Sequence, residues 1–250
     1  IDKADYNEAL KYGLLAEKTA LNVNDTSVQL SSIYSGIGMV YYYLRENDKT
    51  MRYWEKALDI AKKNKDNGYV RTVANNMSTM LIRQRKFQQA IDMIKEYKVR
   101  YPIDDKEFEK REDYIIFSTY TILKQFKNAE VYYKKLVSYY GENAEKNNER
   151  ISMLRSFIFY HYQTKNFNAF YPKTRLFDSL TKKNGNDMLR SENYFVWFKA
   201  DSVQGKYLDA INHYQLYKKF SDSVFNGEKS KQINSLQIQF DTEKKDKDIQ

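Results

Sequence analysis

Apolar positions recur along this chain with a period of about forty residues. Six anchor positions mark the period, separated by 41, 40, 39, 41 and 40 residues: Tyr6, Asn47, Phe87, Phe126, Phe167 and Tyr207. Mostly apolar or small residues follow each anchor after three, seven and ten positions, as Ala90, Ile94 and Tyr97 do. This 3-4-3 spacing places the side chains on one face of an α-helix. The pattern therefore predicts six amphipathic helices of one kind.

A second stripe of mostly apolar residues precedes five of these helices. Its members lie ten and six positions before the anchor, as Met77 and Leu81 do, and therefore share a helical face. Polar links as short as RQRK or LKQ join the two helices of a pair, and longer stretches such as YPIDDK separate the pairs. Links this short make neighbouring helices antiparallel, so we expect helical hairpins.

A hairpin of this size cannot bury its apolar face alone, so consecutive hairpins are expected to stack. The sequence predicts an all-α protein, a right-handed α-solenoid of about five and a half hairpins over residues 1–220. The first helix of each hairpin would line a concave groove. An ordinary helical bundle with chance spacing is the alternative. The low counts of Gly (8) and Pro (2) favour helices over a β fold, which needs many tight turns.

The pattern changes after Tyr217. Ile233, Leu236 and Phe240 are spaced by three and four residues, and a charged stretch follows as far as Ile249. Residues 221–250 are therefore expected to form a C-terminal helix that caps the array or carries a signal away from it.

Several hairpins resemble the tetratricopeptide repeat (TPR) family. The matching patterns are Ile37-Gly38-x-x-Tyr41 with Trp54-x-x-Ala57-Leu58, Phe87-x-x-Ala90, Phe126-x-x-Ala129, and Gly205-x-Tyr207-x-x-Ala210. The resemblance covers about residues 1–220 and implies that the groove holds a peptide or a protein segment. Four residues depart from the family pattern: Asn47, Thr50, Phe170 and Asp201. Residues 151–183 form the copy that departs furthest from it.

The segment LQIQFDTEKKDKDIQ resembles a group of Bacteroidetes membrane-anchored sensor proteins of two-component systems. In that group the TPR array is an extracytoplasmic sensing region, followed by a charged helix, one transmembrane helix and an output domain, usually a histidine kinase. The resemblance implies a location at the periplasmic face of the inner membrane and a transmembrane helix beyond Gln250. A TPR-type transcription regulator with a helix-turn-helix domain and a cytoplasmic adaptor remain as alternatives.

Net charge changes this interpretation little. The chain carries a formal charge of +9, but its Lys and Arg alternate with Asp and Glu, as in KKNKDN and EKKDKD. This pattern is typical of solvated helix faces, so we expect no nucleic-acid binding by this segment. The absence of cysteine excludes disulfides, thiolate metal sites and cysteine nucleophiles.

Catalytic motifs are missing from the sequence. HExxH, GxxxxGK[ST], GxGxxG and GxSxG do not occur. Of the two histidines, His161 falls at a core position and His213 is expected at the surface. The sequence therefore predicts no enzymatic activity, no cofactor and no metal site.

Recognition residues are expected on the first helices, about one position away from the core stripe. These positions are Tyr42, Asn75, Thr79, Arg83, Tyr114, Ser118, Arg155, Phe159, Tyr162 and Lys199. The polar ones could hold a peptide by directional hydrogen bonds, and the aromatic ones could anchor it. A ligand would shift the curvature of the array or the geometry of a homodimer, formed through the C-terminal helix, and residues 225–250 would transmit that shift.

Overall fold

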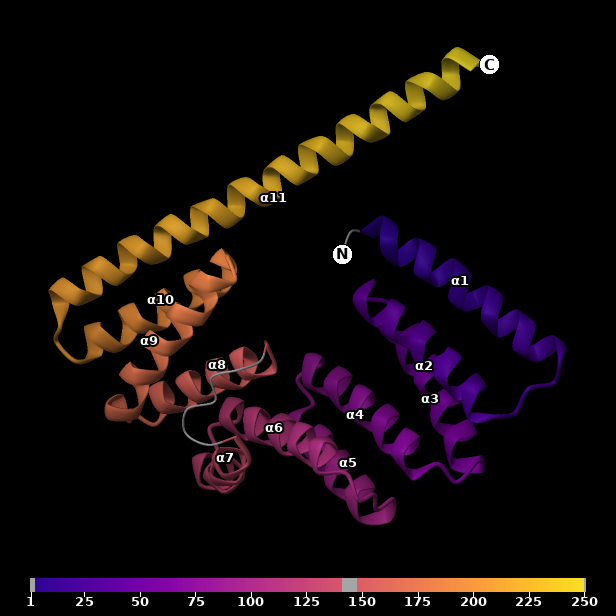
Figure 1. Cartoon of the computed structure of the whole chain (residues 1–250), viewed down its shortest axis with the longest axis horizontal. Helices are drawn as coiled ribbons and strands as arrows, with labels where there is room; N and C mark the ends of the chain where they lie inside the picture. Colours follow the sequence, from indigo (N-terminus) through magenta and orange to yellow (C-terminus); the bar gives the residue numbers. More distant parts are fainter. Residues whose placement is uncertain (1–2, 141–147, 250) are drawn as a thin grey trace. The chain divides into compact units, whose positions relative to one another are not determined.

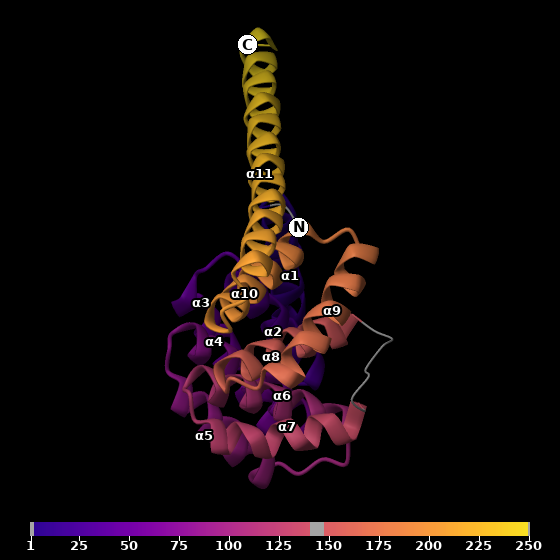
Figure 2. The ribbon, with the colours of Figure 1, turned by 90° about the vertical axis from the view of Figure 1, so that its left-hand side faces the viewer.

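The computed structural model describes residues 3–140 and 148–249, and all regular elements among them are α-helices. The helices are α1 (Lys3–Asn22), α2 (Val28–Tyr43), α3 (Asn47–Lys63), α4 (Asn67–Arg83), α5 (Phe87–Arg100), α6 (Lys106–Ile122), α7 (Phe126–Tyr140), α8 (Asn148–Gln163), α9 (Phe167–Lys183), α10 (Asp187–Val203) and α11 (Tyr207–Ile249). They pack as sequential hairpins (Figures 1 and 2), so the predicted all-α fold is confirmed.

The anchors mark where helices start. Asn47, Phe87, Phe126, Phe167 and Tyr207 are the first residues of α3, α5, α7, α9 and α11. We call these five the second helices, and we call α2, α4, α6, α8 and α10 the first helices. Each hairpin predicted from the sequence therefore consists of one first helix and one second helix.

The chain divides into two compact units, residues 1–139 and residues 140–250. Each unit has its own core: the cluster in unit 1 includes Trp54 and Val73, and the cluster in unit 2 includes Phe170 and Phe177. The boundary predicted at residue 220 falls within α11, which continues unbroken to Ile249, and it stays a prediction.

Close contacts in unit 1 explain why small residues are needed. A Cβ at Gly38 would lie 2.5 Å from ring atom Cδ1 of Trp54, so only glycine fits under this indole. The Trp54 Nε1 group donates a hydrogen bond to the carbonyl oxygen of Ser35, at 3.2 Å. Ala57, Ala90 and Ala129 are fully buried, which lets the backbones of neighbouring helices approach closely.

Most turns between helices, both within and between the hairpins, use a left-handed residue that is usually a basic one. Arg45, Lys65, Arg85, Lys124 and Lys165 have φ between 55° and 63°, and Gly185 and Gly205 take the same conformation. The amide after each of them bonds back to the helix, as Lys86 N does to Leu81 O at 2.8 Å. This is the Schellman arrangement, in which glycine is common. A basic side chain here also faces the negative end of the helix dipole, which favours it electrostatically.

Replacing Ala90 with Leu should lower the free energy of unfolding by about 1–3 kcal/mol, because three added carbons have no space beside a fully buried methyl group. Urea denaturation followed by circular dichroism measures this change. Gln89→Leu is the matched control, since Gln89 is exposed on the same helix and should tolerate leucine. Equal stability of the Ala90→Leu variant and the parent chain would contradict the assigned helix face.

Candidate functional site

In unit 1, the first helices α2 and α4 are joined through a predicted recognition residue. Arg83 donates from Nη1 to the carbonyl oxygen of Tyr42 at 2.7 Å and from Nη2 to Oδ1 of Asn47 at 2.5 Å. Its guanidinium lies over the Tyr42 ring, 4.2 Å from the centroid. The Tyr42 carbonyl also accepts from Arg45 N at 3.2 Å, so Arg83 adds a second hydrogen bond at the end of α2, while its own side chain stays exposed at the surface.

A buried ion pair connects α4 to α6. Arg71 and Glu112 are both 1% exposed, and they form two hydrogen bonds, Nε to Oε1 at 3.0 Å and Nη2 to Oε2 at 2.5 Å. Asn75 approaches Glu112 Oε1 with its Nδ2 group at 3.5 Å. The sequence interpretation missed Arg71 and Glu112. The spacing could have indicated that Glu112 is buried, because it stands four residues before the core residue Ile116 and therefore shares its helical face.

The other predicted recognition residues of unit 1 lie half-buried on α4 and α6. Thr79 donates its hydroxyl to the carbonyl oxygen of Asn75 at 3.0 Å, within its own helix. Tyr114 and Ser118 lie one turn apart on α6. Unit 1 thus holds six of the ten predicted residues, all of them on first helices.

The remaining four belong to unit 2. Arg155 on α8 forms an ion pair with Glu192 on α10, with Nη2 to Oε2 at 2.8 Å. Tyr162 packs against the core cluster, Phe159 is 37% exposed, and Lys199 lies over the Phe195 ring at 4.1 Å. The assignment of these residues to one ligand groove stays a prediction.

Asp201 is the centre of a polar cluster that links three helices of unit 2. It is 1% exposed; Tyr171 on α9 donates its hydroxyl to Oδ1 at 2.8 Å, and His213 Nδ1 on α11 lies 2.6 Å from Oδ2. Burial and the bond to Asp201 raise the pKa of Tyr171 above its usual range. The His213 ring also stacks on Trp197, with centroids 4.1 Å apart.

The burial predicted from the sequence is confirmed for one histidine and wrong for the other. His161 is buried as predicted, and burial lowers its pKa to about 4, so it is neutral near pH 7. The prediction of a surface position for His213 was wrong, because its side chain is only 17% exposed. Asp201 and Trp197 on α10 cover the side of α11 on which His213 stands.

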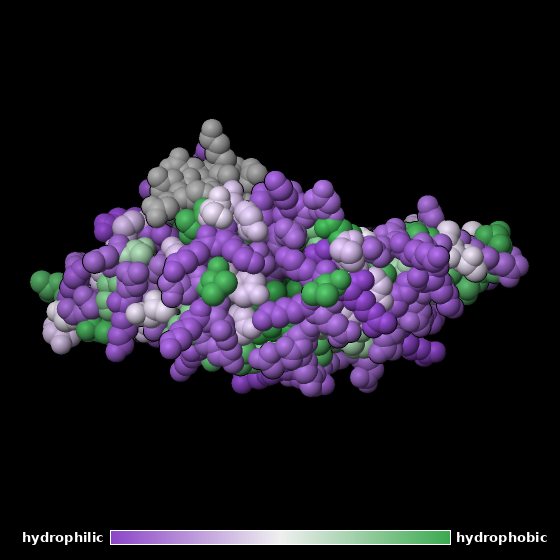
Figure 3. Space-filling view, turned by 90° about the horizontal axis from the view of Figure 1, so that it is seen from below, coloured by the Kyte–Doolittle hydropathy of each residue, from purple (hydrophilic) through white to green (hydrophobic). Residues whose placement is uncertain are grey.

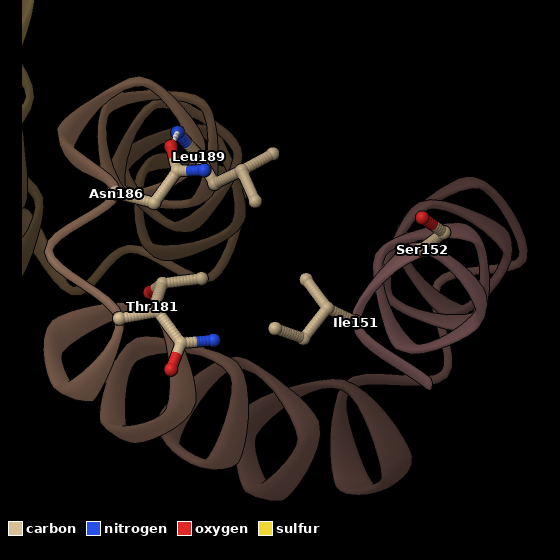
Figure 4. Close-up of a pocket in the computed structure, with 6 residues that line it drawn as sticks. Ile151, Ser152, Thr181, Asn186 and Leu189 are labelled. Atoms are coloured by element: carbon tan, nitrogen blue, oxygen red, sulfur yellow. Dashed lines mark hydrogen bonds between the residues drawn. The ribbon is translucent and has the colours of Figure 1, made fainter. Parts of the chain in front are cut away.

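A hollow of about 510 Å³ lies in unit 2, where the start of α8 meets the end of α9 and the start of α10. It is lined by Ile151, Ser152, Thr181, Asn184, Asn186 and Leu189. Figure 4 shows Ile151 and Leu189 pointing into it from α8 and α10. None of these lining residues is charged. These six residues offer polar and apolar contacts.

Within residues 3–140 and 148–249, no group of three or more His, Cys, Asp or Glu side chains could hold a metal ion. Among the helices of the described part, none is long and apolar enough to cross a membrane. On the face drawn in Figure 3, hydrophilic side chains predominate and apolar ones lie in small separate patches.

Comparison with known proteins supports the fold. The chain is an all-α protein of sequential hairpins that resembles TPR-like solenoid proteins. It is similar to BtubC (BKLC) from P. vanneervenii, with a TM-score of 0.66 and 12% identity over 88% of this chain and 90% of that one. It is also similar to the apo form of RapI, with a TM-score of 0.63 and 15% identity over 90% of this chain and 72% of that one. No family model matches the sequence, and the search of curated proteins found no match. At these identities the likeness concerns the fold alone.

Proposed function

We propose that this chain is a recognition module that binds a peptide or protein segment on its first helices and carries no catalytic role. The main support is the surface of α2 and α4, where neutral polar and aromatic side chains stand beside Arg83 and Asn75. Such groups give directional hydrogen bonds and apolar contacts, which suit a peptide better than a chemical reaction. The similarity in fold to TPR-like repeat proteins is consistent with this proposal.

We further propose that the module is the sensing region of a membrane-anchored signalling protein, as the resemblance of its C-terminal segment implies. The output would be a histidine kinase, and the module would lie at the periplasmic face of the inner membrane. The length of α11 supports the role of a lever, since its 43 residues extend well beyond α10 (Figure 1). Its exposed Phe225, Ile233 and Leu236 could pair with a second copy of the chain.

The sequence downstream of Gln250 tests the signalling role. The sensor proposal requires about twenty predominantly apolar residues there, enough to span a bilayer. A helix-turn-helix domain without such a stretch would support the transcription regulator instead. A stop codon or another repeat would support the adaptor.

Selection of displayed random peptides on the 250-residue chain tests recognition itself. We expect peptides that bind with one-to-one saturation in calorimetry, and we expect Thr79→Arg to weaken them at least about tenfold by placing a long charged side chain on the first-helix surface. Gln89→Arg adds the same charge to the exposed side of α5 and should leave the affinity unchanged. The proposed function would be contradicted if no peptide binds with saturation, or if the Thr79 and Gln89 variants lose affinity equally.

A further inference from the structure

Charge is distributed unequally between the helices of unit 1. α2 carries no charged residue, and α4 carries only Arg71 and Arg83, both of which have partners within the chain. The neighbouring second helix α3 carries eight: Asp48, Lys49, Arg52, Glu55, Lys56, Asp59, Lys62 and Lys63. The first-helix surface of α2 and α4 therefore offers no unpaired charge to a ligand.

This surface is formed by equivalent positions on the two helices. Ser32, Gly36 and Tyr43 are exposed on α2 with spacings of four and seven, so they share one helical face. The forty-residue step from Asn47 to Phe87 relates these three residues to Thr72, Asn76 and Arg83 on α4. We call these six residues the neutral face. Five of them carry no charge, and the sixth, Arg83, already bonds to Tyr42 and Asn47.

Gly36 has open space where a side chain would stand. A Cβ at this position would meet no described atom within 4 Å, whereas one at Gly13 would lie 2.9 Å from Ile37 and one at Gly38 would strike Trp54. Glycine inside a helix costs about 1 kcal/mol relative to alanine. Contacts thus explain Gly13 and Gly38. They do not explain Gly36, nor Gly68 in the first turn of α4, where a Cβ would meet only Asp66 Oδ1 at 3.5 Å. A glycine with open space before it allows another backbone to approach closely.

Two threonine hydroxyls on α4, that of Thr72 in the neutral face and that of Thr79 beside it, are available as hydrogen-bond acceptors. Thr72 donates its hydroxyl to Gly68 O at 2.9 Å, and Thr79 donates to Asn75 O at 3.0 Å. Their hydroxyl hydrogens are therefore used within α4, and the oxygen lone pairs remain as acceptors. An extended peptide has free N–H groups to donate to such acceptors, but a helix has used its own internally.

We infer that the ligand of unit 1 is an extended polypeptide segment without charged side chains, whose backbone passes over Gly36. This inference rests on the proposed peptide-binding function and specifies its ligand. A charged side chain pressed against the neutral face would lose hydration and gain no partner, which is costly. A phosphate-rich ligand needs free Lys or Arg, which α2 and α4 do not supply.

Two mixtures of random decapeptides, acetylated at the N-terminus and amidated at the C-terminus, test the inference. One mixture contains no Asp, Glu, Lys or Arg, and the other has one of these at every third position. We expect the 250-residue chain to retain peptides from the uncharged mixture only. We also expect Gly36→Leu to weaken the retained peptides at least about tenfold in calorimetry.

Gly227→Leu is the matched control, because Gly227 is also an exposed helical glycine with open space around it. The Gly227→Leu variant should bind the peptides with the affinity of the parent chain. Both variants should melt at or above the temperature of the parent chain, since leucine favours helix more than glycine. If Gly36→Leu does not fold, Gly36→Ala replaces it and Gly227→Ala becomes the control. We then expect a smaller loss of peptide affinity in Gly36→Ala and no loss in Gly227→Ala.

The outcomes separate the two proposals. Binders that come from the charged mixture, or full affinity in the Gly36 variant, would overturn this inference and leave peptide recognition standing. Retention of no peptide from either mixture would overturn both.

Discussion

Replacing Glu112 with Gln is expected to lower the free energy of unfolding of unit 1 by about 3–5 kcal/mol. The substitution leaves the Arg71 guanidinium with no opposite charge in a site where both side chains are 1% exposed. An uncompensated buried charge is among the costliest defects in a protein interior. Each unit holds one tryptophan, so in a Trp197→Phe background the fluorescence of Trp54 reports urea unfolding of unit 1 alone.

The double variant Arg71→Met with Glu112→Leu supplies the control. It removes both charges together, and a buried ion pair replaced by apolar side chains is often neutral or stabilising. We therefore expect the double variant to be more stable than Glu112→Gln. A double variant less stable than the single one would show that the pair itself, and not the unpaired charge, accounts for the loss.

Replacing Asp201 with Ala should lower the free energy of unfolding of unit 2 by about 2–4 kcal/mol. The change leaves the Tyr171 hydroxyl and His213 Nδ1 without the carboxylate oxygens that they contact at 2.8 and 2.6 Å. Both side chains are half-buried, so water replaces the lost partners only in part and a share of the desolvation cost remains. Thermal unfolding, followed by Trp197 fluorescence in a Trp54→Phe background, measures the effect.

Asp209→Ala is the matched control for this cluster. Asp209 is exposed in the first turn of α11, so its loss should change stability by less than about 0.5 kcal/mol. Equal stability of the Asp201 and Asp209 variants would mean that the cluster contributes little to holding α11 on α10 and α9.

Sequence periodicity predicted the hairpins because helix faces are set by local spacing. The anchors Phe87, Phe126 and Phe167 start helices, and Ala90 and Ala129 are fully buried where the stripe required small residues. Thr50 and Phe170, which depart from the TPR pattern, are also fully buried. The helix face is therefore kept even where the family residue is not.

Partner choice between helices could not be read from the same spacing. Glu112 meets Arg71 forty-one residues away, and Arg83 bonds to a carbonyl of the preceding first helix. Both depend on how hairpins stack, which a single-helix pattern does not contain. The misplacement of His213 has the same origin, because Asp201 and Trp197 belong to another helix. The turns lacked a glycine signal, since Arg and Lys occupy most of the left-handed positions.

The central claim is that a peptide binds on the first helices of unit 1. Amide NMR spectra of the chain, recorded during titration with a peptide retained from the uncharged mixture, test it most directly. The account predicts that the largest shift changes fall on α2 and α4 and include the amide of Gly36. Changes confined to α3 and α5, or to α11, would contradict it.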